Sequence, residues 1–158
     1  GEGAPFAAID FAPPSTQTGC ALSDEWVVAM ADGLVARSET GIVVLDMDMD
    51  GDERTGWNVF YLHLRTEGRI AVGTRLKAGD PVGHPSCERG SSTGTHVHIA
   101  RKYNGEWMLA EGVVGYNLEG WLAFCGDSAY EGTLVKGGSI VRACVCADAR
   151  SQLNSTLP

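Results

Sequence analysis

The sequence predicts a mainly β protein, an antiparallel β-sheet or sandwich built from hairpins. The chain contains 21 Gly among 158 residues. Turn signals such as Asp50-Gly51 and Asn104-Gly105 separate short runs of β-branched and aromatic residues, as in a hairpin protein. No long segment repeats its apolar residues with the period of a helix. We expect one domain over residues 1–150, long enough to bury a core, followed by a polar tail at 151–158.

Six apolar runs are expected to form the strands of this fold, because each has the length and residue types of a strand. In chain order they cover residues 26–30, 34–36, 41–45, 58–64, 96–101 and 106–109. Within the fourth run, simple alternation predicts that Phe60 and Leu62 face one side and Tyr61 and His63 the other. Residues 127–139 indicate a further hairpin near the C-terminus.

Charge and composition narrow the classes of partner. The net charge of −8 and the pI near 4.8 disfavour a nucleic-acid partner, because phosphate binding depends on clustered Lys and Arg. No apolar run approaches the ~20 residues of a membrane span, and we expect a monomer. The chain opens without an initiator Met, which is typical of a processed or trimmed protein.

Five cysteines favour an oxidising compartment and leave at least one Cys without a partner in the chain. A bridge between Cys144 and Cys146 is not expected, because alternate residues of a strand strain the disulfide geometry. Cys125 is therefore expected to pair with one of these two, and Cys20 with Cys87 is the next candidate pair. A rival interpretation makes Cys87 a zinc ligand or nucleophile, but a Cys protease needs its own paired His.

The four histidines are the residues most suggestive of chemistry. His96 and His98 stand two apart in an extended run, so their rings share a face. Two neighbouring imidazoles suit a divalent transition metal, with one ring as ligand and the other free to transfer protons. His63 adds a third imidazole from a second strand. His84 is interpreted as a surface loop histidine, with a role in a substrate groove as the alternative.

An acidic segment at residues 46–53 resembles the opening of a calcium loop, with carboxylates at Asp46, Asp48 and Asp50 before Gly51. The twelfth position counted from Asp46 is Trp57, so the bidentate Glu of a helix-loop-helix calcium site is missing. We interpret the segment as a solvated acidic hairpin tip, and calcium is disfavoured as a cofactor.

Four motifs, in their order and intervals, resemble those of the lysostaphin-type zinc metalloendopeptidases, which are peptidoglycan hydrolases. The motifs are Ala8-Ile9-Asp10-Phe11-Ala12, Tyr61-Leu62-His63-Leu64, Gly79-Asp80-Pro81-Val82-Gly83-His84 and Ser92-Thr93-Gly94-Thr95-His96-Val97-His98. The segment from His84 to Trp107 is most similar to the staphylolysin-like branch. The resemblance covers residues 5–121 and implies a β-sheet core with the active-site groove on one sheet.

The resemblance also implies a site. The family binds zinc with a His, an Asp and the second His of the His-x-His, and keeps two further histidines for catalysis. Carried over, Asp10 and His98 are metal ligands, and His63 and His96 form the catalytic pair. In the family's chemistry, zinc lowers the pKa of water from about 15.7 to near 7. His96 is then expected to act as the general base and His63 as the proton donor, although the reverse assignment stays open.

One ligand of this set is absent from the chain. In the short form of the motif a His stands four residues before the Asp, where this chain has Phe6. In the staphylolysin-like branch a loop separates the two, and the His then falls before Gly1. We favour the second account, because the other positions are intact. The chain as given is expected to bind zinc weakly or not at all.

The implied function is a secreted or cell-surface bacterial zinc endopeptidase that cuts peptidoglycan cross-links or glycine-rich peptides. The alternative is an inactive family member that binds wall peptides or regulates a hydrolase. A third class is a carrier domain whose histidine accepts phosphate. It fits the hairpins but not the combination of Asp10 with the His-x-His.

Overall fold

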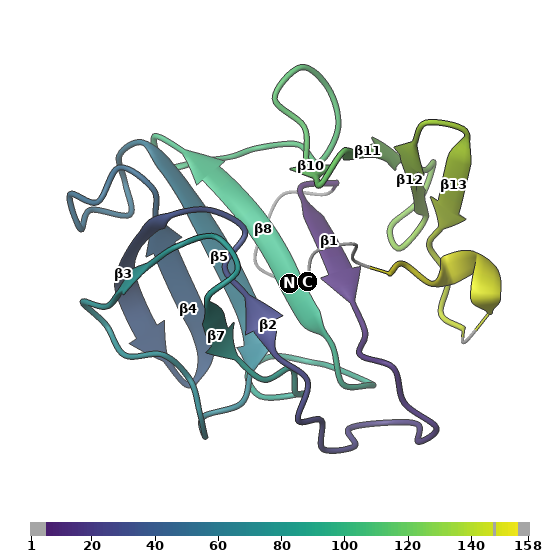
Figure 1. Cartoon of the computed structure of the whole chain (residues 1–158), viewed down its shortest axis with the longest axis horizontal. Coiled ribbons are helices and arrows are strands. Elements are labelled where there is room, and N and C mark those ends of the chain that lie inside the picture. Colours follow the sequence, from purple (N-terminus) through teal and green to yellow (C-terminus); the bar gives the residue numbers. More distant parts are fainter. Residues whose placement is uncertain (1–5, 147, 155–158) are drawn as a thin grey trace.

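The computed structural model describes residues 6–146 and 148–154, and their regular structure is almost entirely β. The large sheet contains β1 (Ala8–Phe11), β3 (Gly33–Glu39), β4 (Gly41–Asp46), β5 (Trp57–Leu64), β6 (Arg75–Leu76), β8 (Val97–Tyr103) and β9 (Glu106–Trp107). Its order is β1-β8-β5-β4-β3-β6, with β9 beside β8. All of these pairs are antiparallel, which confirms the predicted fold class (Figure 1).

Two smaller sheets complete the fold. The short strands β2 (Val27–Val28) and β7 (Pro81–Gly83) pair with each other in front of the large sheet in the view of Figure 1. A four-stranded antiparallel sheet lies beyond β1 and contains β10 (Asn117–Leu118), β11 (Trp121–Cys125), β12 (Gly132–Lys136) and β13 (Ser139–Arg142). Each of the six predicted runs overlaps a strand. The C-terminal hairpin of β12 and β13 lies later than the predicted 127–139, because residues 126–131 form the loop after β11.

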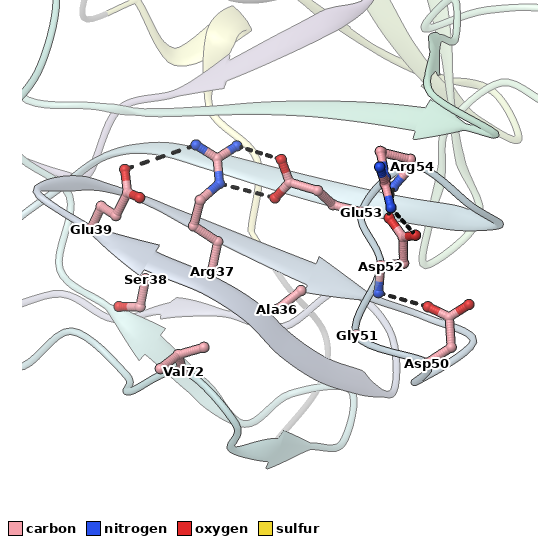
Figure 2. Close-up of a pocket in the computed structure, with 10 residues that line it drawn as sticks. All are labelled: Ala36, Arg37, Ser38, Glu39, Asp50, Gly51, Asp52, Glu53, Arg54 and Val72. Carbon is pink, nitrogen blue, oxygen red and sulfur yellow. Dashed lines mark hydrogen bonds and ion pairs between the residues drawn. The ribbon is translucent and has the colours of Figure 1, made fainter.

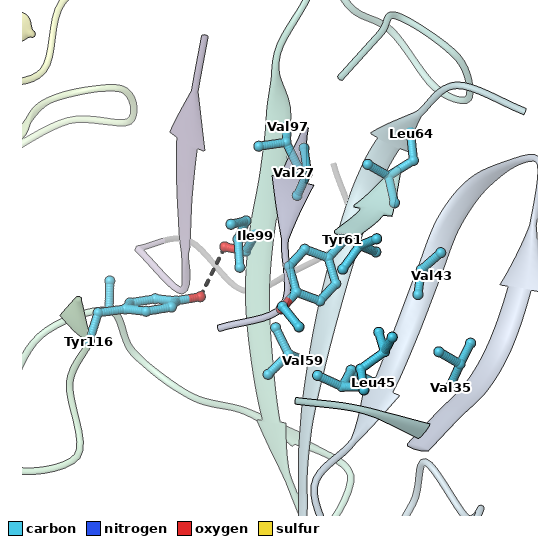
Figure 3. Close-up of a cluster of buried hydrophobic side chains, with 14 of the residues drawn as sticks. Val27, Val35, Val43, Leu45, Val59, Tyr61, Leu64, Val97, Ile99 and Tyr116 are labelled. Atoms are coloured by element: carbon cyan, nitrogen blue, oxygen red, sulfur yellow. Dashed lines mark hydrogen bonds between the residues drawn. The ribbon is translucent and has the colours of Figure 1, made fainter. Parts of the chain in front are cut away.

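The first face of the large sheet is buried in the main core. Val43, Leu45, Val59, Tyr61 and Ile99 alternate inward along β4, β5 and β8 and are almost fully inaccessible (Figure 3). The small sheets cover them, since Val27, Val82, Ala123 and Leu134 belong to the same cluster. Burial of side chains of this size stabilises the fold by roughly 1.5–3 kcal/mol each.

The second face of the large sheet carries a smaller apolar cluster. Its buried members are Ile42, Val44, Phe60, Leu62 and Ala100. Their positions follow the period of two that a pleated strand imposes. The cross-strand partner of Leu62 is His98, so the predicted site residues begin where this cluster ends.

The prediction that Tyr61 and His63 share a face is wrong. Leu62 pairs with Ile42 and Leu64 with Gly41, so His63 is the extra residue of a β-bulge on β5. Its φ of 63° is a left-handed conformation that residues with a Cβ seldom adopt. The bulge turns the His63 ring to the second face. Tyr61 stays in the core, where its hydroxyl accepts a hydrogen bond from the Met30 backbone N–H.

The predicted pairing of Cys125 with Cys144 or Cys146 is also wrong. Cys144 and Cys146 bridge each other, and Cys125 is a free thiol. Both bridged residues lie after the end of β13, where the chain bends and their Cα atoms are 5.2 Å apart. Alternate residues in a strand would be about 6.6 Å apart, so the strand argument does not apply here. The pairing of Cys20 with Cys87 is present.

Three other expectations concern the ends of the chain and the membrane. The tail predicted at 151–158 lies partly outside the described residues, and its first residue, Ser151, ends the 3-10 turn η1 (Ala149–Ser151). The domain boundary at residue 150 stays a prediction. In the described part of the chain, no helix is long and apolar enough to cross a membrane.

Candidate active site on the second face of the large sheet

Asp10 and His98 are brought together by the pairing of β1 with β8. The two residues are direct cross-strand partners, and both side chains point to the second face. His98 Nδ1 lies 2.7 Å from Asp10 Oδ1, the separation of a strong charge-assisted hydrogen bond. Residues 88 positions apart in the sequence thus present a ring nitrogen and a carboxylate oxygen at one point of the sheet.

His96 lies beside this pair, as the spacing of the His-x-His predicts. Its Nε2 is 3.9 Å from Asp10 Oδ2, the carboxylate oxygen that does not contact His98 Nδ1. Its Nδ1 is 2.8 Å from the carbonyl oxygen of Gly94 and 3.2 Å from Ser92 Oγ. The loop that precedes β8 therefore holds the ring through Nδ1 and leaves Nε2 directed at Asp10.

The bulge on β5 brings His63 into the same group. Its ring centroid is 4.5 Å from that of His96 and 6.3 Å from that of His98. His63 Nδ1 is 3.0 Å from the carbonyl oxygen of Glu88. All four predicted site residues, Asp10, His63, His96 and His98, thus lie together on one face of the sheet.

The hydrogen bonds of His63 and His96 define their neutral tautomers. A carbonyl oxygen can only accept, so the Nδ1 atoms that face Glu88 and Gly94 carry the hydrogen. In each neutral ring, Nε2 is then left with a lone pair. Such a nitrogen can accept a proton and, once protonated, can return it, which is the chemistry of general acid–base catalysis.

The electrostatics of the site follow from this crowding. Burial alone would raise the pKa of Asp10, but the hydrogen bond from His98 and the neighbouring imidazoles outweigh it, and the pKa lies below its usual value. Burial lowers the pKa of His63, against the opposing effect of the Glu88 carbonyl. The carboxylate is therefore charged and the His63 ring neutral near pH 7.

Loops at one edge of the site carry the two carbonyls that orient these rings. The disulfide between Cys20 and Cys87 ties the chain just before Glu88 to an N-terminal loop. The same loop contacts Thr95, whose N–H donates to the Gly19 carbonyl and whose hydroxyl donates to that of Ala21. One stapled loop therefore supports both the segment behind His63 and the segment behind His96.

Sequence reasoning missed these orienting groups. The acceptors at Glu88 and Gly94 are backbone carbonyls, which every residue has, so their residue types give no signal. The bridge between Cys20 and Cys87 was the available signal, because a disulfide there implied that two distant loops meet near the His-x-His. The alternative roles for Cys87, as ligand or nucleophile, are excluded while it is bridged.

Asp10 and His98 fit zinc as two of its ligands, since zinc takes carboxylate oxygen and imidazole nitrogen. Among the described residues, no group of three or more converging His, Cys, Asp and Glu ligand atoms includes this pair; the group that does converge is Asp46, Asp48 and Asp50. Phe6, four residues before Asp10, has no ligand atom in its side chain. The two residues are thus of ligand types that zinc binds, but they are fewer than the three protein ligands of a catalytic zinc site.

His84 does not join this site, and the prediction of a surface histidine is wrong. Its side chain is buried, its Nδ1 lies 2.9 Å from the Glu25 carbonyl, and its ring stacks on Trp26 with a centroid distance of 3.9 Å. Gly68 closes the other side of the ring, where a Cβ would come within 3.1 Å of it. This histidine is a packing residue between β7 and neighbouring loops.

Two hollows in the described part of the surface are lined by other residues than the four site residues. A hollow of about 770 Å³ lies between β3 and the loop after β4, where Arg37 forms ion pairs with Glu53 and Glu39 (Figure 2). A smaller one of about 330 Å³ lies against the Cys20–Cys87 bridge and includes Ser86 and Glu88. The smaller hollow borders the loop behind His63, so it is the one adjacent to the candidate chemistry.

The chain matches a family model that covers all four site residues. The model of Peptidase family M23 matches residues 8–109. The chain is similar to the solved structure of pseudoalterin, a deep-sea M23 metalloprotease, with a TM-score of 0.70, 21% identity, and 89% of this chain and 82% of that chain covered. At this identity the likeness shows the fold. No curated protein sequence matches the chain.

Two further solved structures are similar over a shorter stretch. A mutant catalytic domain of EnpA, a prophage-encoded M23 protein from Enterococcus faecalis, is 26% identical, with a TM-score of 0.49 over 69% of this chain and 78% of that chain. LytU is 27% identical, with a TM-score of 0.47 over 66% of this chain and 69% of that chain.

Proposed function

Because the chain belongs to peptidase family M23, we propose that it is a zinc-dependent endopeptidase that hydrolyses peptidoglycan cross-links or glycine-rich peptides. The observation that carries this proposal is the convergence of Asp10 and His98 with His63 and His96 on one face of the large sheet. An oxygen and a nitrogen ligand stand there beside two imidazoles that can transfer protons.

In this proposal Asp10 and His98 hold the metal. Zinc bound to them would act as a Lewis acid on a peptide carbonyl and make hydroxide available near pH 7. The pairing of β1 with β8 fixes both ligands on rigid strands, so little conformational freedom is lost when they bind. A third ligand upstream of Gly1 would complete the set.

The two remaining histidines divide the proton transfers. His96 Nε2 faces the Asp10 carboxylate, so it is the ring placed to take a proton from the attacking water. His63 lies on the neighbouring strand, with its ring centroid 4.5 Å from that of His96. Its Nε2 has no hydrogen in the neutral ring, so it first takes up a proton from solvent, to which His96 releases its own, and then donates that proton to the oxyanion or leaving amine. The carbonyls of Gly94 and Glu88 hold both rings in the tautomer that this exchange requires.

The location follows from the same proposal. A peptidoglycan substrate lies outside the cytoplasm, and disulfides such as Cys20–Cys87 persist in oxidising compartments. We therefore place the protein in the secreted or cell-surface fraction of a bacterium, as a monomeric domain that needs no nucleic-acid or membrane partner.

The test is hydrolysis by the protein extended through its native upstream residues and loaded with zinc. We expect mass spectrometry to detect cleavage of a pentaglycine peptide or of a cross-linked muropeptide. The same protein carrying His96→Ala should leave both intact. If the extended protein binds zinc and cuts neither of them nor any peptide of a broad wall-peptide panel, the function is instead that of an inactive relative that binds wall peptides.

A further inference from the structure

The loop between β4 and β5 contains a second group of potential metal ligands. Side-chain oxygens of Asp46, Asp48 and Asp50 all lie within 4.8 Å of one another. All three ligand atoms are carboxylate oxygens, with no nitrogen or sulfur among them, which suits a hard cation and not zinc. An acidic hairpin tip in water has no need to gather its charges in this way.

Asp46 is buried, contrary to the prediction of a solvated tip. It is fully inaccessible, and its two carboxylate oxygens accept from the N–H groups of Asp48, at 3.2 Å, and Gly51, at 2.7 Å. Asp48 and Asp50 are exposed at the rim of the loop. In the described part of the chain, no Lys, Arg or His forms an ion pair with any of these three carboxylates. A buried charge without a counter-charge is costly.

Asn58 provides an independent observation. It is fully inaccessible, and its Oδ1 is one of the buried side-chain atoms without a hydrogen-bond partner. Buried amide oxygens almost always have a donor, so this one requires an explanation. A cation supplies one, because amide oxygens are common calcium ligands.

The strand pairing places the Asn58 side chain beside Asp46. Asn58 is the cross-strand partner of Asp46, and the bond from Met47 N–H to the Trp57 carbonyl makes Asp46 and Asn58 the closer, non-hydrogen-bonded type of pair. Their side chains share a face with Cβ atoms about 4.5–5.5 Å apart. Asn58 Nδ2 donates to the Thr55 carbonyl, so the amide lies against the inside of the loop.

Other residues of the loop between β4 and β5 also bear on the three carboxylates. Thr55 Oγ1 donates to Asp50 Oδ2 and the Asp52 N–H donates to Asp50 Oδ1, so each oxygen of that carboxylate keeps a further lone pair for another partner. Asp52 is already engaged by Arg54, on the outer side of the loop seen in Figure 2. Arg54 thus forms its ion pair with Asp52 and does not neutralise Asp46, Asp48 or Asp50.

We propose that Asp46, Asp48, Asp50 and the Asn58 amide oxygen form a binding site for Ca²⁺. The missing Glu at the twelfth position argued against calcium, but Asn58, the thirteenth residue and the second of strand β5, stands opposite Asp46 and would supply an oxygen in its place. Three carboxylates and one neutral oxygen leave further positions for water. The affinity is therefore that of an extracellular module, with a dissociation constant of about 10⁻⁴ to 10⁻³ M.

The bound ion would tie the end of β4 to the start of β5. Its effect is on stability, because β5 reaches the candidate active site only at its other end, at His63. Calcium therefore acts at the tip of the β4–β5 hairpin, apart from the proposed zinc ligands on β1 and β8, and calcium binding does not depend on the peptidase activity.

The test is a calorimetric Ca²⁺ titration of protein freed of metal by chelation, together with its melting temperature. Wild-type protein should bind one Ca²⁺ and melt at a higher temperature in about 10 mM Ca²⁺, because the ion binds only the folded chain. Asp48→Asn and Asp50→Asn, at exposed positions where folding is not at risk, should each weaken binding by about tenfold or more. Asn58→Leu should weaken it as well.

Two controls separate the site from general charge effects and from zinc. Asp127→Asn removes an exposed carboxylate from a distant loop and should leave Ca²⁺ affinity unchanged. His98→Ala should also leave it unchanged, whatever happens to zinc. Absence of saturable Ca²⁺ binding to the wild type up to about 10 mM, or equal affinities in Asp48→Asn, Asp50→Asn and Asp127→Asn, would overturn the proposal.

Discussion

Two pairs of residues in the candidate active site are held in different ways. Asp10 and His98 are held by the sheet itself, as direct partners in the regular ladder between β1 and β8. His63 and His96 are held by loops, since each ring is oriented by a backbone carbonyl from the segment 86–95. The ladder is rigid, whereas the loops depend on the Cys20–Cys87 staple. Metal binding and proton transfer should therefore be separable.

The largest expected effect comes from removing one loop-held ring. In the zinc-loaded protein, His96→Ala should lower kcat by about 10²–10⁴-fold, because a positioned proton-transfer group is lost. Zinc content, measured by metal analysis of the same sample, should stay at the wild-type level. Loss of zinc together with activity would make His96 a ligand and break the distinction between the two pairs.

The next effect concerns the staple. The double substitution of Cys20 and Cys87 by Ser should lower the free energy of unfolding by about 2–4 kcal/mol, because the bridge closes a long loop. The sequence separation is 67. It should also lower kcat while zinc affinity is unchanged, since the carbonyls behind His63 and His96 are loosened and the β1–β8 ladder is not.

A matched control for the staple is present in the chain. The Cys144–Cys146 bridge spans a separation of 2, so replacing both residues by Ser should cost only about 1–2 kcal/mol. Denaturant unfolding and steady-state kinetics on both double variants measure the two effects. Equal losses of stability in the two variants, or lost zinc in the first, would contradict the account.

The smallest effect tests the bulge. His63 adopts a φ of 63°, which glycine tolerates at no cost and residues with a Cβ seldom adopt. His63→Gly and His63→Ala both remove the ring, but the glycine variant should be more stable by about 1 kcal/mol. Thermal unfolding of the two variants gives the difference. An alanine variant as stable as the glycine variant would mean that the bulge is lost on substitution.

The contrast between β8 and β5 also explains what the sequence could predict. A period of two places His96 and His98 on one face, and β8 keeps its register, so that prediction is right. The same rule failed for His63, because the rule does not anticipate a one-residue bulge. The family resemblance still grouped His63 with His96 and His98, to which it lies close, since motif order depends on the fold and not on local alternation.

Other features had no local signal. Asp10 meets His98 through a pairing of strands 88 positions apart, which only the resemblance suggested. The burial of Asp46 and His84 follows from tertiary neighbours, namely the β5 strand opposite the first and Trp26 against the second. The Cys144–Cys146 bridge forms in a bend after β13, where strand geometry gives no guidance.

The most direct test of the central claim is a zinc titration of three variants in the protein extended through its native upstream residues. The claim is that the sheet-held pair binds zinc and the loop-held pair moves protons. His98→Ala should lose tight zinc binding and, with it, the rise in melting temperature that zinc gives the wild type. His63→Ala and His96→Ala should bind zinc and melt as the wild type does. If His96→Ala loses zinc and His98→Ala keeps it, the assignment of the two pairs is inverted and the claim is wrong.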